Sequence, residues 1–226
     1  MISRVFFTRG SLMLLLPLAG LIYAKLNHNN GNVHILVTAL DKGIPFVPFF
    51  VIPYLAFYAF IFLILFWFLF NSGRLYFLTL FSIFAGFLIC FVIYGFFQTT
   101  VPRPIIAEQN VFLQLTGLVY RLDNPYNAFP SIHVLTSSII FLGSKRAMDF
   151  SQKISRLSRG MTVLIILSTL FLKQHTIIDL AGGLVIGAAV FKTVETLMGL
   201  NNRITPPAAY SRSRWDKSAK GPLFQD

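Results

Sequence analysis

The chain has 226 residues, of which 55% are hydrophobic and 12% are charged. A soluble domain averages about 25% charged residues, so this composition excludes an ordinary soluble domain and indicates a membrane protein. The net charge of +11 does not indicate nucleic-acid binding, because the basic residues form no single patch. The one cysteine, Cys90, cannot form an internal disulfide, so cysteine usage does not indicate the redox compartment.

The first half of the chain predicts three membrane helices. Residues 12–24 follow two arginines, and because no small-residue cleavage pattern closes this run we expect an uncleaved helix rather than a signal peptide. Residues 25–50 are mixed and contain two prolines, so we expect an interfacial segment outside the membrane. Residues 52–70 and 75–97 are long enough to cross, since about 20 residues span the hydrocarbon core.

The second half predicts three more helices. Residues 98–130 form the longest polar connection, and residues 143–160 form a strongly basic loop. The further helices are expected at residues 131–142, 161–172 and 177–197. The tail, residues 201–226, is polar and basic, and we expect it to be disordered and cytoplasmic.

Six spans place both termini on one side of the membrane, and the basic residues predict which side that is. Of the 19 lysines and arginines, 14 fall on the side of the termini and five on the other. Cytoplasmic loops are enriched in lysine and arginine, so we expect cytoplasmic termini and all four histidines on the extracytoplasmic side. The sequence therefore predicts one membrane domain over residues 1–200, with its core at 50–197.

Two polar segments in this apolar sequence, Phe129–His133 and Lys173–Asp179, are the first candidates for a functional site. Ionisable side chains at membrane depth are costly and are therefore interpreted as functional. His175 and Asp179 are four residues apart, which on a helix places them on one face. The carboxylate could then fix the tautomer of a nucleophilic histidine. Equally, Asp179 could simply cap the last helix.

The segment around Pro130 and Ser131 is typical of a helix start. Free backbone N–H groups and a hydroxyl at such an end bind anions well. His133, two residues further on, could protonate a departing alkoxide. The alternative is a buried histidine whose hydrogen bonds are satisfied within the protein.

Arg103 lies between two prolines, and its guanidinium fork matches two phosphate oxygens. It could instead be an interfacial arginine that reaches toward water. Ser168 and Lys173 are weaker candidates for contacts with the same anion. Two histidines and an aspartate could also bind zinc, but no H-E-x-x-H spacing supports a metal site, so we expect none.

The order of these residues resembles the type 2 phosphatidic acid phosphatase (PAP2) superfamily of membrane lipid phosphatases and phosphotransferases. The family's first motif, K-x6-R-P, is matched at Arg103-Pro104, with Phe96 at the position of its lysine. Its second motif, P-S-G-H, is matched at residues 130–133, with Ile132 in place of the glycine.

The third motif, S-R-x5-H-x3-D, is matched at Ser168, His175 and Asp179, with Thr169 in place of the arginine. The sequence motifs F-P-S-x-H and K-Q-H-x-x-x-D resemble those of the branch that includes inositol phosphorylceramide synthases more than those of the common phosphatases. The resemblance covers residues 50–197. Because two cations of the family are missing, Lys173 is a candidate to replace part of their charge.

The resemblance implies an all-α, six-helix membrane bundle of the PAP2/haloperoxidase type that needs no metal or other cofactor. It implies a phosphohistidine at His175, oriented by Asp179, with His133 as general acid and then base. It also implies a set of residues that hold the phosphate, namely Arg103, Ser131, Ser168 and Lys173.

From these observations we expect a multi-pass enzyme, in the cell membrane, that hydrolyses a lipid phosphate or diphosphate on the extracytoplasmic side. Its expected partners are that substrate and membrane lipids, and not nucleic acid. Two alternatives stay open. One is a transferase that moves a phosphoryl head group from a lipid to an alcohol, and the other is a catalytically silent scaffold or carrier.

Overall fold

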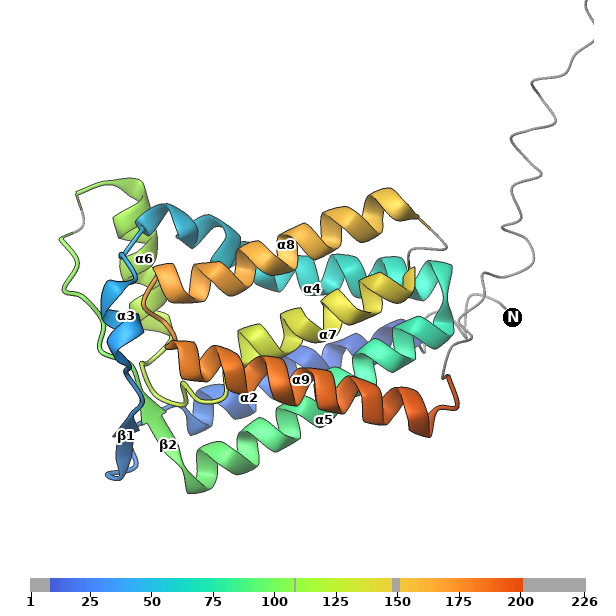
Figure 1. Cartoon of the computed structure of the whole chain (residues 1–226), viewed down its shortest axis with the longest axis horizontal. Helices are drawn as coiled ribbons and strands as arrows, with labels where there is room; N and C mark the ends of the chain where they lie inside the picture. Colours follow the sequence, from blue (N-terminus) through green and yellow to red (C-terminus); the bar gives the residue numbers. More distant parts are fainter. Residues whose placement is uncertain (1–8, 108, 148–150, 201–226) are drawn as a thin grey trace, which may run out of the picture.

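The computed structural model describes residues 9–107, 109–147 and 151–200, in which the helices form an elongated bundle (Figure 1). The bundle helices are α2 (Leu15–Leu26), α4 (Val51–Asn71), α5 (Gly73–Phe96), α7 (Ile132–Arg146), α8 (Gln152–Phe171) and α9 (Ile177–Leu197). A 3₁₀ turn, η1 (Leu12–Leu14), leads into α2. The expected tail at 201–226 lies outside the described residues.

Five of these helices are long and apolar enough to cross a membrane, which fits a multi-pass membrane protein. They are Arg9–Leu26, Pro48–Asn71, Gly73–Phe96, Gln152–Phe171 and Ile177–Leu197. The remaining helix, α7, has 15 residues and packs against α5, α8 and α9. Ten of its residues are buried, so protein rather than lipid surrounds most of this helix.

Two expected connections contain more helix than the sequence predicted. α8 begins at Gln152 and not at residue 161, so the basic segment lies largely on a helix instead of in a loop. Ser151 caps this helix through the N–H of Ile154, and lysine and arginine are good helix formers. The polar connection 98–130 contains α6 (Val111–Leu122), whose first turn is capped by Asn110.

Short elements cover the end of the bundle that lies opposite the α4–α5 turn (Figure 1). Strands β1 (Val33–Ile35) and β2 (Gln98–Thr100) pair in parallel there, beside α3 (Ala39–Gly43) and α6. The 3₁₀ turn η2 (Pro48–Phe50) then leads into α4. This cap is built from the segment 25–50, expected to be interfacial, and from the long polar connection.

Glycines let α9 approach α7 at close range. A Cβ atom at Gly183 would lie 2.7 Å from the main-chain oxygen of Ser131, and one at Gly187 would lie 2.0 Å from Ser138 Oγ. Small residues of this kind allow helix backbones to pack closely in membranes. The N–H of Ser131 donates to the carbonyl of Asp179 at 3.2 Å, so the starts of α7 and α9 are joined directly.

Candidate active site

His175 lies in the turn between α8 and α9, and not on α9 itself. Lys173 has a positive φ of 53°, which turns the chain, and the N–H groups of Gln174 and His175 both donate to the carbonyl of Thr169. Helix α9 begins at Ile177 with Thr176 as its N-cap. The same-face spacing of a helix therefore does not apply to His175 and Asp179, although the two side chains still meet.

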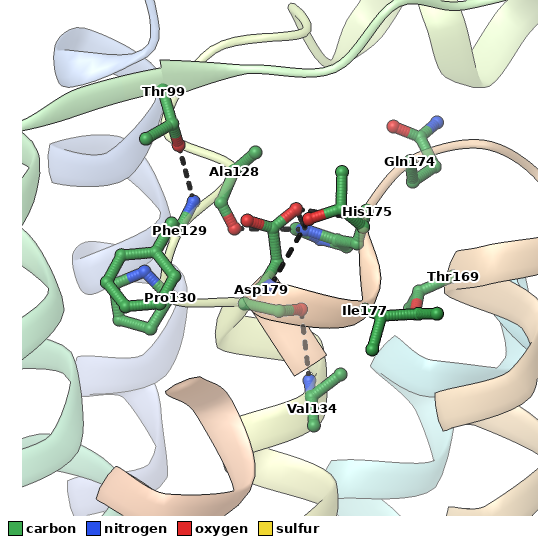
Figure 2. A network of polar contacts seen from close by, with 12 residues as sticks. Thr99, Ala128, Phe129, Pro130, Val134, Thr169, Gln174, His175, Ile177 and Asp179 are labelled. Atoms are coloured by element: carbon green, nitrogen blue, oxygen red, sulfur yellow. Dashed lines mark hydrogen bonds and ion pairs between the residues drawn. The ribbon is translucent and has the colours of Figure 1, made fainter. Parts of the chain in front are cut away.

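The Nδ1 atom of His175 faces two oxygen atoms (Figure 2). It lies 3.0 Å from the main-chain oxygen of Ala128 and 3.7 Å from Asp179 Oδ2. A carbonyl oxygen can only accept a hydrogen bond, so this contact requires the proton on Nδ1. Nε2 then carries the free lone pair, which is the arrangement that a nucleophilic histidine needs.

Strand β2 holds Ala128 in place. The N–H of Ala128 donates to the carbonyl of Thr99 at 3.4 Å, and the N–H of Phe129 donates to Thr99 Oγ1 at 2.7 Å (Figure 2). The carbonyl of Ala128 is the nearer partner of His175. The sequence prediction missed it because a main-chain acceptor leaves no signature in residue type.

Asp179 caps α9 and also lies beside His175. Its Oδ2 accepts a hydrogen bond from the N–H of Thr176 at 2.6 Å, while Thr176 Oγ1 accepts from the N–H of Asp179, which makes a capping box. The same Oδ2 lies near His175. The carboxylate is buried, and its Oδ1 has no hydrogen-bond partner among the described residues. It therefore supplies a fixed negative charge behind the histidine.

His133 projects from the first turn of α7, and aromatic rings surround it. Its ring centroid lies 4.7 Å from that of Tyr54, 4.4 Å from that of Phe57 and 6.0 Å from that of His175. The Nε2 atom is buried and has no hydrogen-bond partner among the described residues. His133 is therefore not the satisfied core histidine that the alternative interpretation required, and its free nitrogen can exchange a proton with a bound group.

Arg103 reaches the site from the connection between β2 and α6. Its Nη1 donates to the main-chain oxygen of Asp123 at 2.6 Å, its Nη2 donates to the side chain of Gln174, and its guanidinium lies 4.6 Å from the ring centroid of Tyr120. These contacts place its charge beside the turn that carries His175. Its guanidinium is thus held by protein groups, and does not simply reach toward the interface.

Three other predicted phosphate ligands make structural contacts within the protein. Ser131 Oγ accepts from the N–H of Val134 as the N-cap of α7, and Ser168 Oγ donates to the carbonyl of Ile165. Both serines are fully buried. The ammonium of Lys173 donates to the carbonyls of Asp41 and Ile44. The structure thus brings the two histidines, Asp179 and Arg103 to one end of the bundle, and uses these three side chains to hold its elements together.

A carboxylate that the sequence did not single out, Asp41, ties α3 to the start of α9. Its Oδ1 accepts from the N–H of Ile177 at 2.8 Å, and its Oδ2 accepts from the N–H of Thr38 at 2.7 Å. Burial alone would raise the pKa of this carboxyl. The hydrogen bonds from Thr38 and Ile177, with the charge of Lys173, outweigh that effect and lower the pKa of Asp41 below 3.8.

Two cavities meet at His175. The first has a volume of about 370 Å³ and lies between α2, α4 and α5, with walls that include Leu16, Ile61, Phe87 and Phe91 and a polar end that includes His133 and His175. The second has a volume of about 330 Å³, and its lining includes His175, the cations Lys42, Arg103 and Lys173, and the carboxylate of Asp41. One cavity is therefore apolar with a polar end, and the other, the basic cavity, has three cations against one carboxylate.

Comparison with known proteins identifies the family. A family model described as the PAP2 superfamily matches residues 31–193. The chain belongs to the PAP2 superfamily. Neither the curated proteins nor the solved structures compared with it gave a match. The match extends the family region predicted from the motifs toward the N-terminus, so that it includes β1 and α3.

Membership of the PAP2 superfamily agrees with the site geometry. The superfamily includes phosphatases and related phosphotransferases, and the chain's Pro-Ser-x-His and His-x-x-x-Asp segments are the ones that form the histidine pair. Phe96, at the position of the family's lysine, is exposed and lines neither cavity. Among the described residues, no three histidine, cysteine, aspartate or glutamate side chains gather as a metal site would require.

Proposed function

We propose that this PAP2 protein is an integral membrane enzyme that cleaves a phosphoester or phosphoanhydride bond of a lipid through a phosphohistidine at His175. The observation that carries the proposal is the histidine pair at the polar end of an otherwise apolar cavity. A hydrocarbon chain fits the apolar walls, and a phosphoryl group fits between the two imidazoles.

The reaction takes place in two balanced steps. In the first, the lone pair of His175 Nε2 attacks phosphorus, an N–P bond forms, and the P–O bond to the leaving group breaks. Protonated His133 donates its proton to the departing oxygen. In the second step, His133 takes a proton from water as the water oxygen attacks phosphorus. The N–P bond then breaks, which releases the phosphorylated product and restores both histidines.

Charge stabilisation supplies much of the acceleration in phosphoryl transfer. Asp179 and the carbonyl of Ala128 stabilise positive charge on His175, and Arg103 lowers the cost of negative charge on the phosphoryl oxygens. In this proposal the family's missing lysine and arginine leave Arg103 as the principal cation, with Lys173 and Lys42 at the second cavity. Ser131 and Ser168 would contribute by fixing the helices rather than by contacting phosphate.

We further propose that α7 is a sixth, short transmembrane helix and that the site faces the extracytoplasmic side. The support is the burial of α7 among the longer helices and the excess of basic residues toward the end of the bundle away from the histidines. Labelling of single cysteines placed at residues 31 and 73, with an impermeant reagent on intact cells, tests this orientation. Only the cysteine at residue 31 is expected to react.

A second candidate reaction replaces water with an alcohol. The basic cavity behind His175 is large enough for a small polyol and opens onto the same imidazole. Purified protein incubated with a lipid donor and candidate alcohols would then form a transferred product, as well as or instead of the hydrolysis product.

The central test is turnover of a panel of lipid phosphates, diphosphates and phosphodiesters by purified protein. Wild type, His175→Gln and His133→Gln are assayed side by side, with and without a chelator. We expect chelator-resistant turnover that both substitutions abolish. Full activity in His175→Gln would overturn the proposed nucleophile, and inactivity of the folded wild type toward every lipid would favour the scaffold alternative.

A further inference from the structure

The polar end of the apolar cavity contains a carboxylate that the proposed reaction does not use. Asp123, the C-cap residue of α6, lines this cavity together with His133 and His175. Its negative charge interacts with His175. A carboxylate in this position repels a phosphoryl group, so its presence beside the reacting histidines needs an explanation.

Side chains from α2, its following turn and α4 hold the carboxylate. Tyr23 donates its hydroxyl to Asp123 Oδ1 at 3.1 Å, Asn27 donates its amide to the same oxygen at 2.7 Å, and Tyr54 donates to Oδ2 at 3.4 Å. A carboxylate can accept about four hydrogen bonds, so Oδ2 keeps capacity for another donor. All three of these donors are neutral groups.

Arg103 is nearby but bonds elsewhere. Its guanidinium donates to the main-chain oxygens of Asp123 and Tyr120 and to the side chain of Gln174. Burial raises the pKa of the Asp123 carboxyl, although the charge of Arg103 opposes this effect. Burial therefore disfavours the charge of Asp123, and a cation delivered with the substrate would stabilise it.

The aromatic walls beside Asp123 suit such a cation. Tyr23, Tyr58 and Tyr94 line the same cavity, and the rings of Tyr23 and Tyr94 meet edge to face at 6.2 Å. Aromatic faces combined with a carboxylate form a recognised type of site for ammonium groups.

We propose that Asp123 and these tyrosines form an ammonium subsite, so that the lipid cleaved at His175 is a phosphodiester with an amino-alcohol head group, such as phosphoethanolamine or phosphocholine. This inference rests on the proposed function. The ammonium lies against Asp123 while the phosphoryl group lies between the histidines. Cleavage transfers the amino-alcohol phosphate to His175 Nε2, and the diacylglycerol oxygen leaves with the proton of His133.

The catalytic test compares four lipids with identical acyl chains: phosphatidylethanolamine, phosphatidylcholine, phosphatidylglycerol and phosphatidic acid. Wild type is expected to have a kcat/KM at least tenfold higher for one of the two amino lipids than for phosphatidylglycerol. Asp123→Asn keeps the shape of the side chain and, with its oxygen in the place of Oδ1, the hydrogen bonds from Tyr23 and Asn27. It removes the charge, and should abolish this preference by slowing only the amino lipids.

Asp41→Asn is the matched control, because it also changes a buried carboxylate to an amide but lies outside the apolar cavity. It should slow all four lipids by a similar factor and keep the preference. Faster turnover of phosphatidic acid or phosphatidylglycerol by wild type would overturn the subsite while leaving the proposed function intact. An equal loss for every lipid in Asp123→Asn would assign Asp123 a structural role only.

Binding supplies a second readout that does not require turnover. Dodecylphosphocholine and dodecyl phosphate, added below their micelle concentrations to His175→Gln protein in maltoside detergent, probe the head group alone. We expect a larger thermal stabilisation by dodecylphosphocholine, which disappears when Asp123→Asn is added to this variant. Equal stabilisation by both compounds in His175→Gln would overturn the subsite.

Discussion

The ring centroids of His133 and His175 lie 6.0 Å apart, but different contacts hold the two side chains. A hydrogen bond to Ala128 and the nearby carboxylate of Asp179 fix the imidazole of His175. Ring contacts surround His133 instead, and its Nε2 has no hydrogen-bond partner in the part of the chain that the structure describes. A nucleophile needs a defined tautomer, and a proton carrier needs a nitrogen free to exchange its proton. The difference in support therefore matches the two roles in the proposed reaction.

Substitution of His133 tests this comparison and has the largest expected effect. His133→Gln should lower kcat by about 10²–10⁴-fold, because general acid–base catalysis contributes on that scale. The pH profile of kcat should also lose the limb that His133 contributes. Tyr58→Phe, which keeps a ring beside His133, is the control and should retain both limbs. Unchanged kcat in His133→Gln would show that another group carries the proton.

The guanidinium beside the His175 turn is the next group to change. Arg103→Lys keeps one positive charge but loses the planar fork whose two nitrogens reach Asp123 and Gln174. We expect kcat/KM to fall about 10–100-fold, in line with the loss of one or two charged hydrogen bonds. Lys42→Met removes another cation of the basic cavity, an exposed one, and should have a smaller effect. A larger effect of Lys42→Met would contradict the role given to Arg103.

The close packing of α9 on α7 fixes the position of His175 relative to His133. Gly183→Ala places a methyl group 2.7 Å from a main-chain oxygen that cannot rotate away, and should destabilise the protein by about 1–3 kcal/mol. At Gly160 the new Cβ would meet no atom within 4 Å from other described segments, so Gly160→Ala should be neutral or stabilising by roughly 0.5–1 kcal/mol. Thermal unfolding in detergent measures both. Similar midpoints for the two variants would contradict the close packing.

Substitution of Asp41, whose carboxylate holds the start of α9 beside the His175 turn, has the smallest expected effect. Asp41→Asn removes a charge from the start of α9 and should cost roughly 1 kcal/mol of stability and a few-fold in turnover. Because the folded pKa of Asp41 is lowered below 3.8, its contribution is present above that pH and is lost as the pH falls through the folded pKa.

The pH dependence gives this prediction a direct readout. The difference in thermal midpoint between wild type and Asp41→Asn should be constant from pH 5 to 8 and should shrink below about pH 4. A difference that grows on acidification would reverse the sign and contradict the assigned contacts of the carboxylate.

Residue type and spacing were enough to predict most of the bundle and the histidine pair. The last helix, for example, was predicted at residues 177–197 and lies at Ile177–Leu197. Long apolar runs bounded by turns give a strong signal for membrane helices. The histidines and Asp179 stood out because ionisable residues are rare in such a sequence.

The rest depended on contacts between distant segments. Asp41 and Asp123 reach the site from parts of the chain that carry no motif, and Ala128 acts through its main chain. The start of α8 was missed because its basic residues suggested a loop, although buried serines face its neighbour: Ser144 and Ser158 lie 2.7 Å apart across α7 and α8. The spacing of residues along the sequence does not predict such contacts between helices.

Trapping of a covalent intermediate tests the central claim most directly. Wild type is mixed with a ³²P-labelled lipid that it turns over, quenched in alkali within milliseconds and digested for mass spectrometry, with His175→Gln in parallel. The account predicts an acid-labile, alkali-stable phosphoryl adduct on His175 of wild type, and none in the variant. An adduct on another residue, or undiminished turnover and labelling in His175→Gln, would contradict it.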